Sequence, residues 1–336
     1  MKIHLRSLLF STILGVAACN DATGPDADNR ALLFLGRAAS GDDVYVVMVE
    51  SGQLVKLTGD GMSGRAEWSP DGTRMAFESL RDVMTDFASG QIFVMNADGT
   101  QPHNLSDALE VDDVGPVWSP DGSQILFTRR GELHVMNADG SAVRPLTDGF
   151  AQVTGHAWSP DGSRIAFVSR LDGDADVYVM GANGGAPVQL TNEDGSDQAP
   201  AWSPDGSRIA FESLRSGNPE IFTMKPDGSD ITRVTNNPST DAGPVWSPDG
   251  RQLAFVSLRD RNVEVYVINV DGTGVKNVSD SPAVDAEPTW SPGNRIAFTS
   301  DRSGDLQVHT VNSDGSGLTQ ITDFAGPVFV PRWRPR

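Results

Sequence analysis

The sequence is poor in the residues that support the commonest metal and covalent chemistry. It has one cysteine and five histidines among 336 residues. A single cysteine excludes both an intrachain disulfide framework and cysteine-rich zinc sites. Basic residues are also scarce, with 26 against 45 acidic residues, which gives a formal net charge of -19. A surface this negative repels phosphate backbones, so we expect no nucleic-acid binding.

Long hydrophobic runs are missing as well. The most apolar stretch, residues 8–18, is too short for a membrane-spanning helix, which needs about 20 residues. It follows the basic residues Lys2 and Arg6, an order typical of a secretory signal peptide. Hydrophobic residues still make up 38% of the chain, beside 35 glycines, which is enough for a folded core and excludes wholesale disorder.

The only cysteine, Cys19, lies directly after this stretch. The segment Val-Ala-Ala-Cys at 16–19 resembles the lipobox of bacterial lipoproteins, in which the cysteine becomes the lipidated first residue. The resemblance implies a signal peptide over 1–18 and a lipid on Cys19; the alternative is a plain cleaved signal with an incidental cysteine. Residues 19–30 are acidic and rich in turn formers, which predicts a flexible tether.

These features predict a protein of the bacterial cell envelope. The lipid would be its only attachment to a membrane. It would be held either on the periplasmic side of the outer membrane or at the cell surface.

Residues 31–336 consist of one repeat that occurs seven times. Five of the seven tryptophans are followed by Ser-Pro-Asp-Gly. This is turn chemistry, because proline fixes φ, aspartate binds nearby amides and glycine adopts positive φ. The tryptophans recur at intervals of 40 to 50 residues, at Trp68, Trp118, Trp158, Trp202, Trp246, Trp290 and Trp333.

Each repeat contains four short segments with the composition of β-strands, such as 208–213, 176–180, 187–191 and 199–202. They alternate apolar and polar residues or are rich in β-branched residues, and turn formers bound them. Four strands in about 44 residues predict a β-propeller blade. We therefore predict an all-β, seven-bladed propeller of four-stranded blades. The C-terminal strand, ending at Trp333, would close it by joining the N-terminal three strands.

The repeat can also be compared with known families. The order Trp-Ser-Pro-Asp-Gly, Ile-Ala-Phe, Tyr-Val-Met-Asn-x-Asp-Gly and Leu-Thr resembles the TolB-type, WD40-like propeller repeat (PD40), and it covers essentially all of residues 31–336. The resemblance implies a propeller that docks other envelope proteins around its channel mouth. Some related propellers belong to peptidases, but this sequence has no Gly-x-Ser-x-Gly elbow, no His-Glu-x-x-His and no glycine-rich phosphate loop.

One set of acidic residues recurs outside the turns. Five residues before the tryptophan, four repeats carry an aspartate: Asp113, Asp197, Asp241 and Asp285. Symmetry would bring them to one channel mouth, and Glu287 and His156 lie on the same segments. These aspartates either cap the amides of their own loops or form an acidic funnel that attracts basic peptides or cations. Oxygen ligands of this kind suit calcium, magnesium or manganese.

A second acidic pattern is the alternation of Asp172, Asp174 and Asp176. It resembles the start of a calcium-binding EF-hand loop, but Val177 and Asn183 stand where that loop needs glycine and glutamate. We interpret the segment as an acidic hairpin loop, with a calcium site as the alternative.

The sequence thus favours a non-catalytic, lipid-anchored binding or scaffold protein. It would be a monomer outside its complex and would bind an envelope protein or peptide with a basic segment at the acidic channel mouth, with no cofactor. One alternative is a lyase or hydrolase that uses a divalent cation such as calcium or manganese in the channel, with His156 and Asp197 or Asp241 taking part. The other is a structural or sensory component of an envelope complex.

Overall fold

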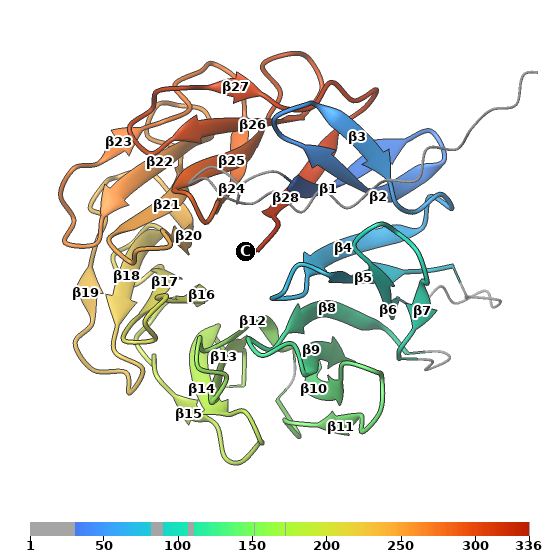
Figure 1. The fold of residues 1–336 in the computed structure, drawn as a ribbon. Coiled ribbons are helices and arrows are strands. Elements are labelled where there is room, and N and C mark those ends of the chain that lie inside the picture. Colours follow the sequence, from blue (N-terminus) through green and yellow to red (C-terminus); the bar gives the residue numbers. More distant parts are fainter. Residues whose placement is uncertain (1–30, 82–89, 107–110, 151, 172, 336) are drawn as a thin grey trace, which may run out of the picture.

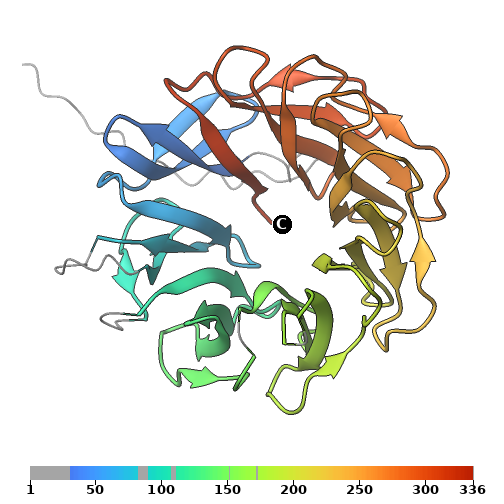
Figure 2. The same ribbon diagram turned by 180° about the vertical axis from the view of Figure 1, so that it is seen from behind.

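The seven repeats fold into seven four-stranded sheets arranged in a ring (Figure 1, and from behind in Figure 2). This computed structural model describes residues 31–81, 90–106, 111–150, 152–171 and 173–335. Every element in these ranges is a strand, which confirms the predicted seven-bladed, all-β propeller. None of the described residues forms a helix that could cross a membrane. The predicted signal peptide, Cys19 and the tether lie outside the described residues.

Each sheet runs from an inner strand beside the central channel to an outer strand at the rim. In that order, the first three sheets are β28 (Val328–Trp333), β1 (Ala31–Ala38), β2 (Gly41–Met48) and β3 (Gln53–Lys56); β4 (Ser63–Trp68), β5 (Arg74–Ser79), β6 (Gln91–Asn96) and β7 (His103–Asn104); β8 (Asp113–Trp118), β9 (Gln124–Arg129), β10 (Glu132–Asn137) and β11 (Arg144–Pro145). The next two are β12 (Thr154–Trp158), β13 (Arg164–Ser169), β14 (Asp176–Gly181) and β15 (Val188–Gln189); β16 (Asp197–Trp202), β17 (Ile209–Ser213), β18 (Glu220–Met224) and β19 (Thr232–Arg233). The last two are β20 (Asp241–Trp246), β21 (Gln252–Ser257), β22 (Glu264–Asn269) and β23 (Lys276–Asn277); β24 (Asp285–Trp290), β25 (Arg295–Ser300), β26 (Gln307–Asn312) and β27 (Thr319–Gln320).

The ring closes as the sequence predicts. β28, near the end of the chain, pairs antiparallel with β1, and Leu32 lies opposite Trp333. The first sheet therefore takes its inner strand from the C-terminal end and its other three strands from the N-terminal end of the propeller. This pairing occupies a sheet edge that would otherwise be open to association with other chains.

The core of each blade is a pair of stacked rings. In each sheet, a fully buried phenylalanine lies in the middle of the second strand. These residues are Phe34, Phe77, Phe127, Phe167, Phe211, Phe255 and Phe298. Each faces a ring on the third strand, with centroids 5.5–5.9 Å apart. His134 and His309 occupy two of these third-strand positions. Both therefore take part in the ring packing of their blades, His309 as a buried and His134 as a partly buried side chain.

The tryptophans connect neighbouring blades. In six of the seven, the indole N–H donates to a carbonyl of an adjacent inner strand, for example Trp246 to Ala201 at 2.9 Å. Buried aromatic side chains with a satisfied polar atom are strong packing elements. The tryptophan repeat is thus explained by blade contacts.

All seven inner strands contain a β-bulge where their pairing register with the second strand shifts. The bulged residue has positive φ in most blades, even where it is not glycine, as at Ala199 (50°) and Glu287 (56°). Bulges change the direction in which side chains point and are often found near functional sites. Here four of the seven bulged residues line cavities in the channel: Arg65, Gly115, Gly155 and Val330.

Candidate functional site at the channel

The two faces of the ring are built from different turns. We call the face where the inner strands begin the entry face. It consists of the loops that precede the inner strands and the turns that join the second and third strands of each sheet. The opposite face carries the Ser-Pro-Asp-Gly and Asn-x-Asp-Gly turns.

On the opposite face, the turn aspartates cap their own turns. Asp161 accepts hydrogen bonds from the Ser159 hydroxyl at 2.6 Å and from the Ser163 amide at 3.0 Å. These hydrogen bonds lower the pKa of Asp161, and similar ones lower the pKa of Asp71, each to about 2. The acidic residues of these turns are therefore explained by local structure.

The four aspartates predicted at the channel mouth are the first residues of their inner strands, and their side chains are fully buried. Each forms an ion pair with an arginine of the same blade. The pairs, with their shortest distances, are Asp113–Arg129 (2.7 Å), Asp197–Arg215 (2.9 Å), Asp241–Arg259 (2.7 Å) and Asp285–Arg302 (2.9 Å).

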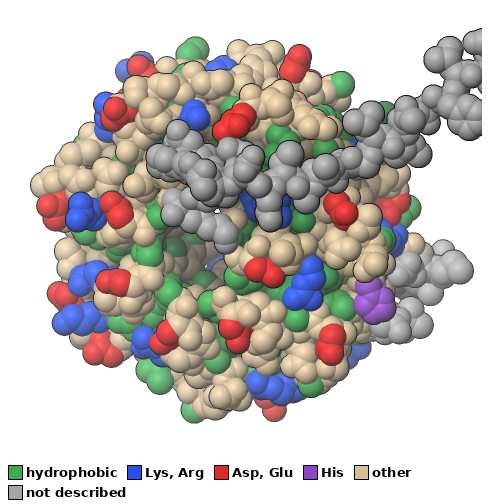
Figure 3. All heavy atoms as spheres, in the orientation of Figure 1, with side chains coloured by type: hydrophobic (Ala, Val, Ile, Leu, Met, Phe, Trp, Pro, Cys, Tyr) green, Lys and Arg blue, Asp and Glu red, His purple; other side chains and the backbone are tan. Residues whose placement is uncertain are grey.

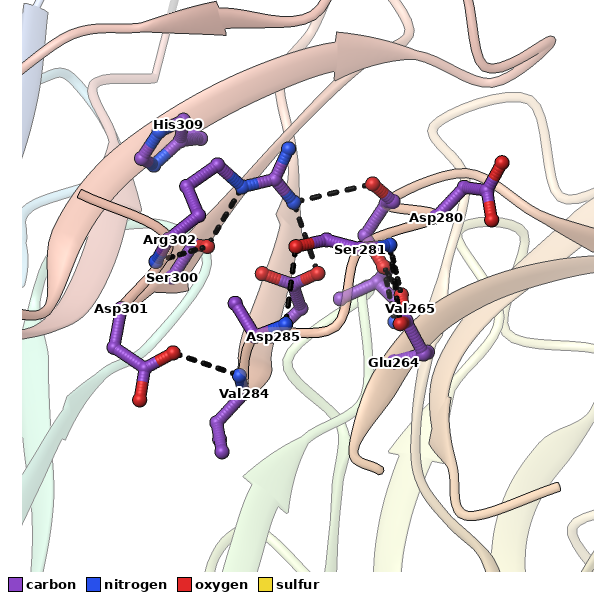
Figure 4. Close-up of polar contacts among 12 residues, drawn as sticks. Glu264, Val265, Asp280, Ser281, Val284, Asp285, Ser300, Asp301, Arg302 and His309 are labelled. Atoms are coloured by element: carbon purple, nitrogen blue, oxygen red, sulfur yellow. Dashed lines mark hydrogen bonds and ion pairs between the residues drawn. The ribbon is translucent and has the colours of Figure 1, made fainter. Parts of the chain in front are cut away.

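The arginines cover the aromatic core. Figure 4 shows Arg302 between Asp285 and Ser300, and the Arg302 Nε–H donates to the Ser300 hydroxyl at 2.8 Å. The same guanidinium lies over the ring of Phe298, 5.6 Å from its centroid. Each arginine thus combines an ion pair with a cation–π contact.

Two blades without the aspartate show the alternative packing. Valine occupies the position of the aspartate at Val153 and Val328, and both valines are buried. In these blades a phenylalanine covers the core rings instead of an arginine. Phe150 packs edge-on against Phe167, 5.9 Å away, and Phe324 covers the equivalent rings of the first sheet. In six blades, aspartate therefore accompanies arginine or valine accompanies phenylalanine. In the seventh, Ser63 occupies the position of the aspartate and Arg81 lies over the Phe77 ring.

These carboxylates are thus not presented to the channel mouth as free charges. Each is neutralised by an arginine, which is a different role from either a loop cap or an acidic funnel. Burial raises the pKa of Asp241. A signal for two of these arginines was present in the sequence, because Ser-Leu-Arg begins at the last residue of the second strand at 213–215 and 257–259.

Glu287 and His156 lie on the inner strands β24 and β12, and both side chains form hydrogen bonds with the backbone of a neighbouring inner strand. Glu287 accepts a hydrogen bond from the Val330 amide of the next inner strand at 2.7 Å. His156 Nε2 is 2.7 Å from the Gly115 carbonyl oxygen. Burial lowers the pKa of His156 to about 4 against the opposing effect of that hydrogen bond. The ring is therefore neutral at pH 7, with the proton on Nε2.

The acidic hairpin loop also uses its carboxylates locally. Asp176 is buried and accepts hydrogen bonds from Gln189 and Thr191, both at 3.1 Å. Asp174 accepts one from the Gly195 amide at 3.4 Å, and Asp172 lies outside the described residues. Within the described part of the chain, no three His, Cys, Asp or Glu side chains are grouped so as to hold a metal ion.

Cavities extend from the entry face into the channel. A groove of about 360 Å³ on the entry face is lined by three exposed apolar side chains, Met62, Leu80 and Val114, together with Asp112 and Glu78. Glu78 and Val114 also line a cavity of about 300 Å³ that reaches His156. The residues that line these two cavities depart from the repeat, so the repeat pattern does not predict them.

The comparisons with known proteins agree with this architecture. A family model described as the TolB beta propeller domain matches residues 150–244 and 234–336. These two matches together cover more than half of the chain.

Two curated relatives align with part of the chain. It is 30% identical over 135 residues to the uncharacterized protein Atu1656 of Agrobacterium fabrum, and 32% identical over 87 residues to the uncharacterized peptidase YuxL of Bacillus subtilis. The alignments cover 39% and 26% of this chain, but only 44% and 12% of those proteins. The chain thus matches less than half of the length of either relative.

Solved structures of proteins with different names share the fold. TolB from Acinetobacter baumannii has a TM-score of 0.60 at 20% identity, covering 91% of this chain and 83% of that one. An oligogalacturonate lyase in complex with manganese has a TM-score of 0.71 at 16% identity, covering 84% and 86%. A puromycin hydrolase has a TM-score of 0.74 at 14% identity, covering 89% and 53%. Such likeness shows the fold alone.

Proposed function

This chain belongs to the TolB beta-propeller domain family, and on that premise we propose that it is a non-catalytic binding protein. Its docking surface is the entry face. The partner is a protein or peptide segment that carries both basic and apolar side chains. The observation that carries this proposal is the groove on the entry face, where exposed apolar side chains adjoin carboxylates.

Exposed apolar side chains recur around the entry face. Leu80, Leu214 and Leu258 each follow directly after a second strand, and their side chains are 37–42% exposed. The amide of each leucine donates to a carbonyl of the loop just before an inner strand, for example Leu80 to Met62 at 3.0 Å. The three leucines are therefore fixed beside the channel mouth. Single exposed apolar residues need no explanation, but a recurring set at one mouth is typical of an interaction site.

The same face carries an excess of unpaired acidic residues. In its loops and turns, ten acidic side chains make no ion pair with a described residue, against three arginines. The acidic residues are Asp112, Asp148, Asp174, Glu193, Asp194, Asp260, Asp280, Asp301, Asp305 and Asp323, and the arginines are Arg130, Arg170 and Arg261. Figure 3 shows acidic and basic side chains interspersed over one face of the ring, both at its edge and closer to its centre. The negative electrostatic field of the unpaired acidic residues attracts a basic segment, and contacts with the exposed apolar side chains then hold that segment in place.

The test uses synthetic peptides of one length that alternate lysine with leucine, glutamate with leucine, or lysine with serine. Their binding to the protein from residue 20 onward is measured by fluorescence anisotropy at low and high salt. We expect the lysine–leucine peptide to bind in a salt-dependent manner, because exposed charges are screened by salt. The other two peptides should bind at least tenfold more weakly.

A matched pair of variants locates the site. The first replaces Leu80, Leu214 and Leu258 by serine, and the control replaces equally exposed residues of the opposite face, Val143→Ser, Ile231→Ser and Val275→Ser. The entry-face variant should lose the lysine–leucine peptide and the control should keep it. Equal binding by both variants would place the docking surface elsewhere.

We also propose that a lipid on Cys19 holds the propeller in the bacterial envelope. The support is the lipobox-like segment at 16–19 and the family membership. Growth of cells expressing the full chain with an alkyne-labelled fatty acid should label the wild type and leave Cys19→Ser unlabelled. Labelling of the Cys19→Ser variant, or none of the wild type, would contradict the anchor.

A divalent cation is the alternative to test, because a lyase of this fold is described in complex with manganese. Thermal melts after chelation, with Ca²⁺, Mg²⁺ or Mn²⁺ added back, are the measurement. A ligand at a hundredfold its dissociation constant stabilises the folded state by about 2.7 kcal/mol. The binding proposal expects no shift in melting temperature. A shift with Mn²⁺ that Asp174→Asn or His156→Ala removes would favour the enzyme.

A further inference from the structure

The groove on the entry face places two carboxylates beside apolar side chains. Glu78 lies on β5, and Asp112 lies just before β8 of the neighbouring blade (Figure 1). Met62, Leu80 and Val114 line the same groove, and their side chains are 37–49% exposed. A side chain that enters the groove therefore meets both apolar surface and negative charge.

Each of the two carboxylates is held by one backbone amide. The Gly115 amide donates to Glu78 Oε1 at 2.7 Å, and the Gly90 amide donates to Asp112 Oδ1 at 2.8 Å. Neither carboxylate makes an ion pair with a described residue. A third carboxylate of the groove, Asp42, is already paired with an arginine. Glu78 and Asp112 are thus the carboxylates that can bind a cation from a partner.

The electrostatics of the groove favour such a cation. Burial raises the pKa of Glu78 and the charge of Asp112 adds to this effect, while the Gly115 amide and Arg65 oppose it. Arg65 lines the adjoining channel cavity together with Glu78, but it is not among the described residues that line the groove. A cation bound beside both carboxylates therefore reduces their repulsion and favours the ionised form of Glu78.

Gly64 leaves room for a ligand at the Glu78 carboxylate, because a Cβ at this position would lie 3.0 Å from Glu78 Oε2. Glu212 has the position of Glu78 on β17, but its surroundings differ. Gln198 lies opposite Glu212 on the inner strand, where the earlier blade has Gly64. Thr240 takes the position of Asp112. Glu212 is therefore a matched control that lacks the glycine and the second carboxylate.

We propose that this groove binds one arginine side chain of the partner, whose guanidinium contacts Glu78 and Asp112 and whose methylene groups pack against the exposed apolar side chains. Arginine is favoured over lysine because a planar guanidinium can donate to two carboxylates at once and is more weakly hydrated than an ammonium group. This arginine site rests on the proposed docking function and adds the residue type that the partner presents to the groove.

The test compares a peptide that alternates arginine with leucine and the lysine–leucine peptide of equal length, by fluorescence anisotropy on the same protein. The arginine–leucine peptide should bind at least about fivefold more tightly. Glu78→Gln and Asp112→Asn should each remove most of this preference, because each removes one charge and keeps an acceptor for the backbone amide. Glu212→Gln should retain it. The melting temperature of each variant establishes that it is folded.

Three results would overturn the arginine site. These are equal affinity of the wild type for the two peptides, an unchanged preference in both Glu78→Gln and Asp112→Asn, or the same loss in Glu212→Gln as in Glu78→Gln. If the two peptides bind equally and the serine variant of Leu80, Leu214 and Leu258 loses both, only the arginine site fails and the docking surface stands. If neither peptide binds the wild type, both proposals fail.

Discussion

The opposite face and the entry face of the ring use the same residue type in opposite ways. On the opposite face, aspartates lie in exposed turns, accept hydrogen bonds from neighbouring serines and amides, and have lowered pKa values. At the entry face, the aspartates that begin the inner strands are fully buried and paired with arginine. Recurrence in the sequence therefore marks structural roles on both faces.

The departures from the repeat are concentrated in the loops of the entry face and in the adjoining channel. The opposite face repeats its turn chemistry almost unchanged, whereas the entry face varies its loops and the adjoining channel replaces a proline by His156 and a bulge glycine by Arg65. Loops on a rigid scaffold commonly carry function. In this propeller the exposed side chains of the entry face and the irregular channel residues, and not the recurring buried aspartates, are the ones to test for binding.

The largest effect is expected from breaking a buried ion pair. Arg259→Met leaves the buried Asp241 carboxylate without its partner, which should lower the free energy of unfolding by about 3–5 kcal/mol. Chemical denaturation measures the change. The double variant Arg259→Met, Asp241→Leu should recover most of it, because no buried charge remains. Arg251→Met on the opposite face should change stability by at most about 0.5 kcal/mol, and an equal loss there would contradict the comparison.

A similar effect is expected from placing the aspartate in a blade that lacks the arginine. Val153→Asp introduces an unpaired buried carboxylate beneath Phe150, as Arg259→Met does beside Asp241, and should also cost about 3–5 kcal/mol. Thermal and chemical unfolding measure it. The further change Phe150→Arg should restore part of the stability. An additional loss on adding the arginine would show that the pairing rule does not transfer between blades.

A turn hydroxyl of the opposite face should matter less. The Ser203 hydroxyl donates to Asp205 at 2.6 Å and accepts from the Arg208 amide at 2.9 Å. Ser203→Ala should therefore cost about 1 kcal/mol, the typical value of a hydrogen bond. Ser159→Ala in the preceding blade should give a similar value. A large difference between the two would mean that the turns are less equivalent than their geometry suggests.

The smallest effect concerns pH. The pKa of Asp71 is lowered by its hydrogen bonds from an ordinary value of 3.8 to about 2. Its ionised form therefore stabilises the fold above about pH 4, and this contribution is lost as the pH falls towards 2. Melting curves should show the difference between wild type and Asp71→Asn at pH 6 and almost none at pH 2. A difference that is constant with pH would argue against the capping role.

The blade number, the strand order and the closure were predictable because they rest on periodicity. The tryptophan and strand patterns recur seven times and the Ser-Pro-Asp-Gly turn five times, and local chemistry fixes each of them. The roles of Asp197 and Arg215 were not predictable in the same way, because the two residues are 18 positions apart and meet only through strand pairing. The channel cavity lined by Arg65 and His156 is formed by four blades at once, so no local pattern identifies it.

The most direct test of the docking surface is a hydrogen-exchange footprint of the lysine–leucine peptide on the protein. We predict slower exchange in the turns that contain Leu80, Leu214 and Leu258, with no change in the Ser-Pro-Asp-Gly turns. Slower exchange on the opposite face, or only in the channel around His156, would contradict the proposal that the entry face binds the partner.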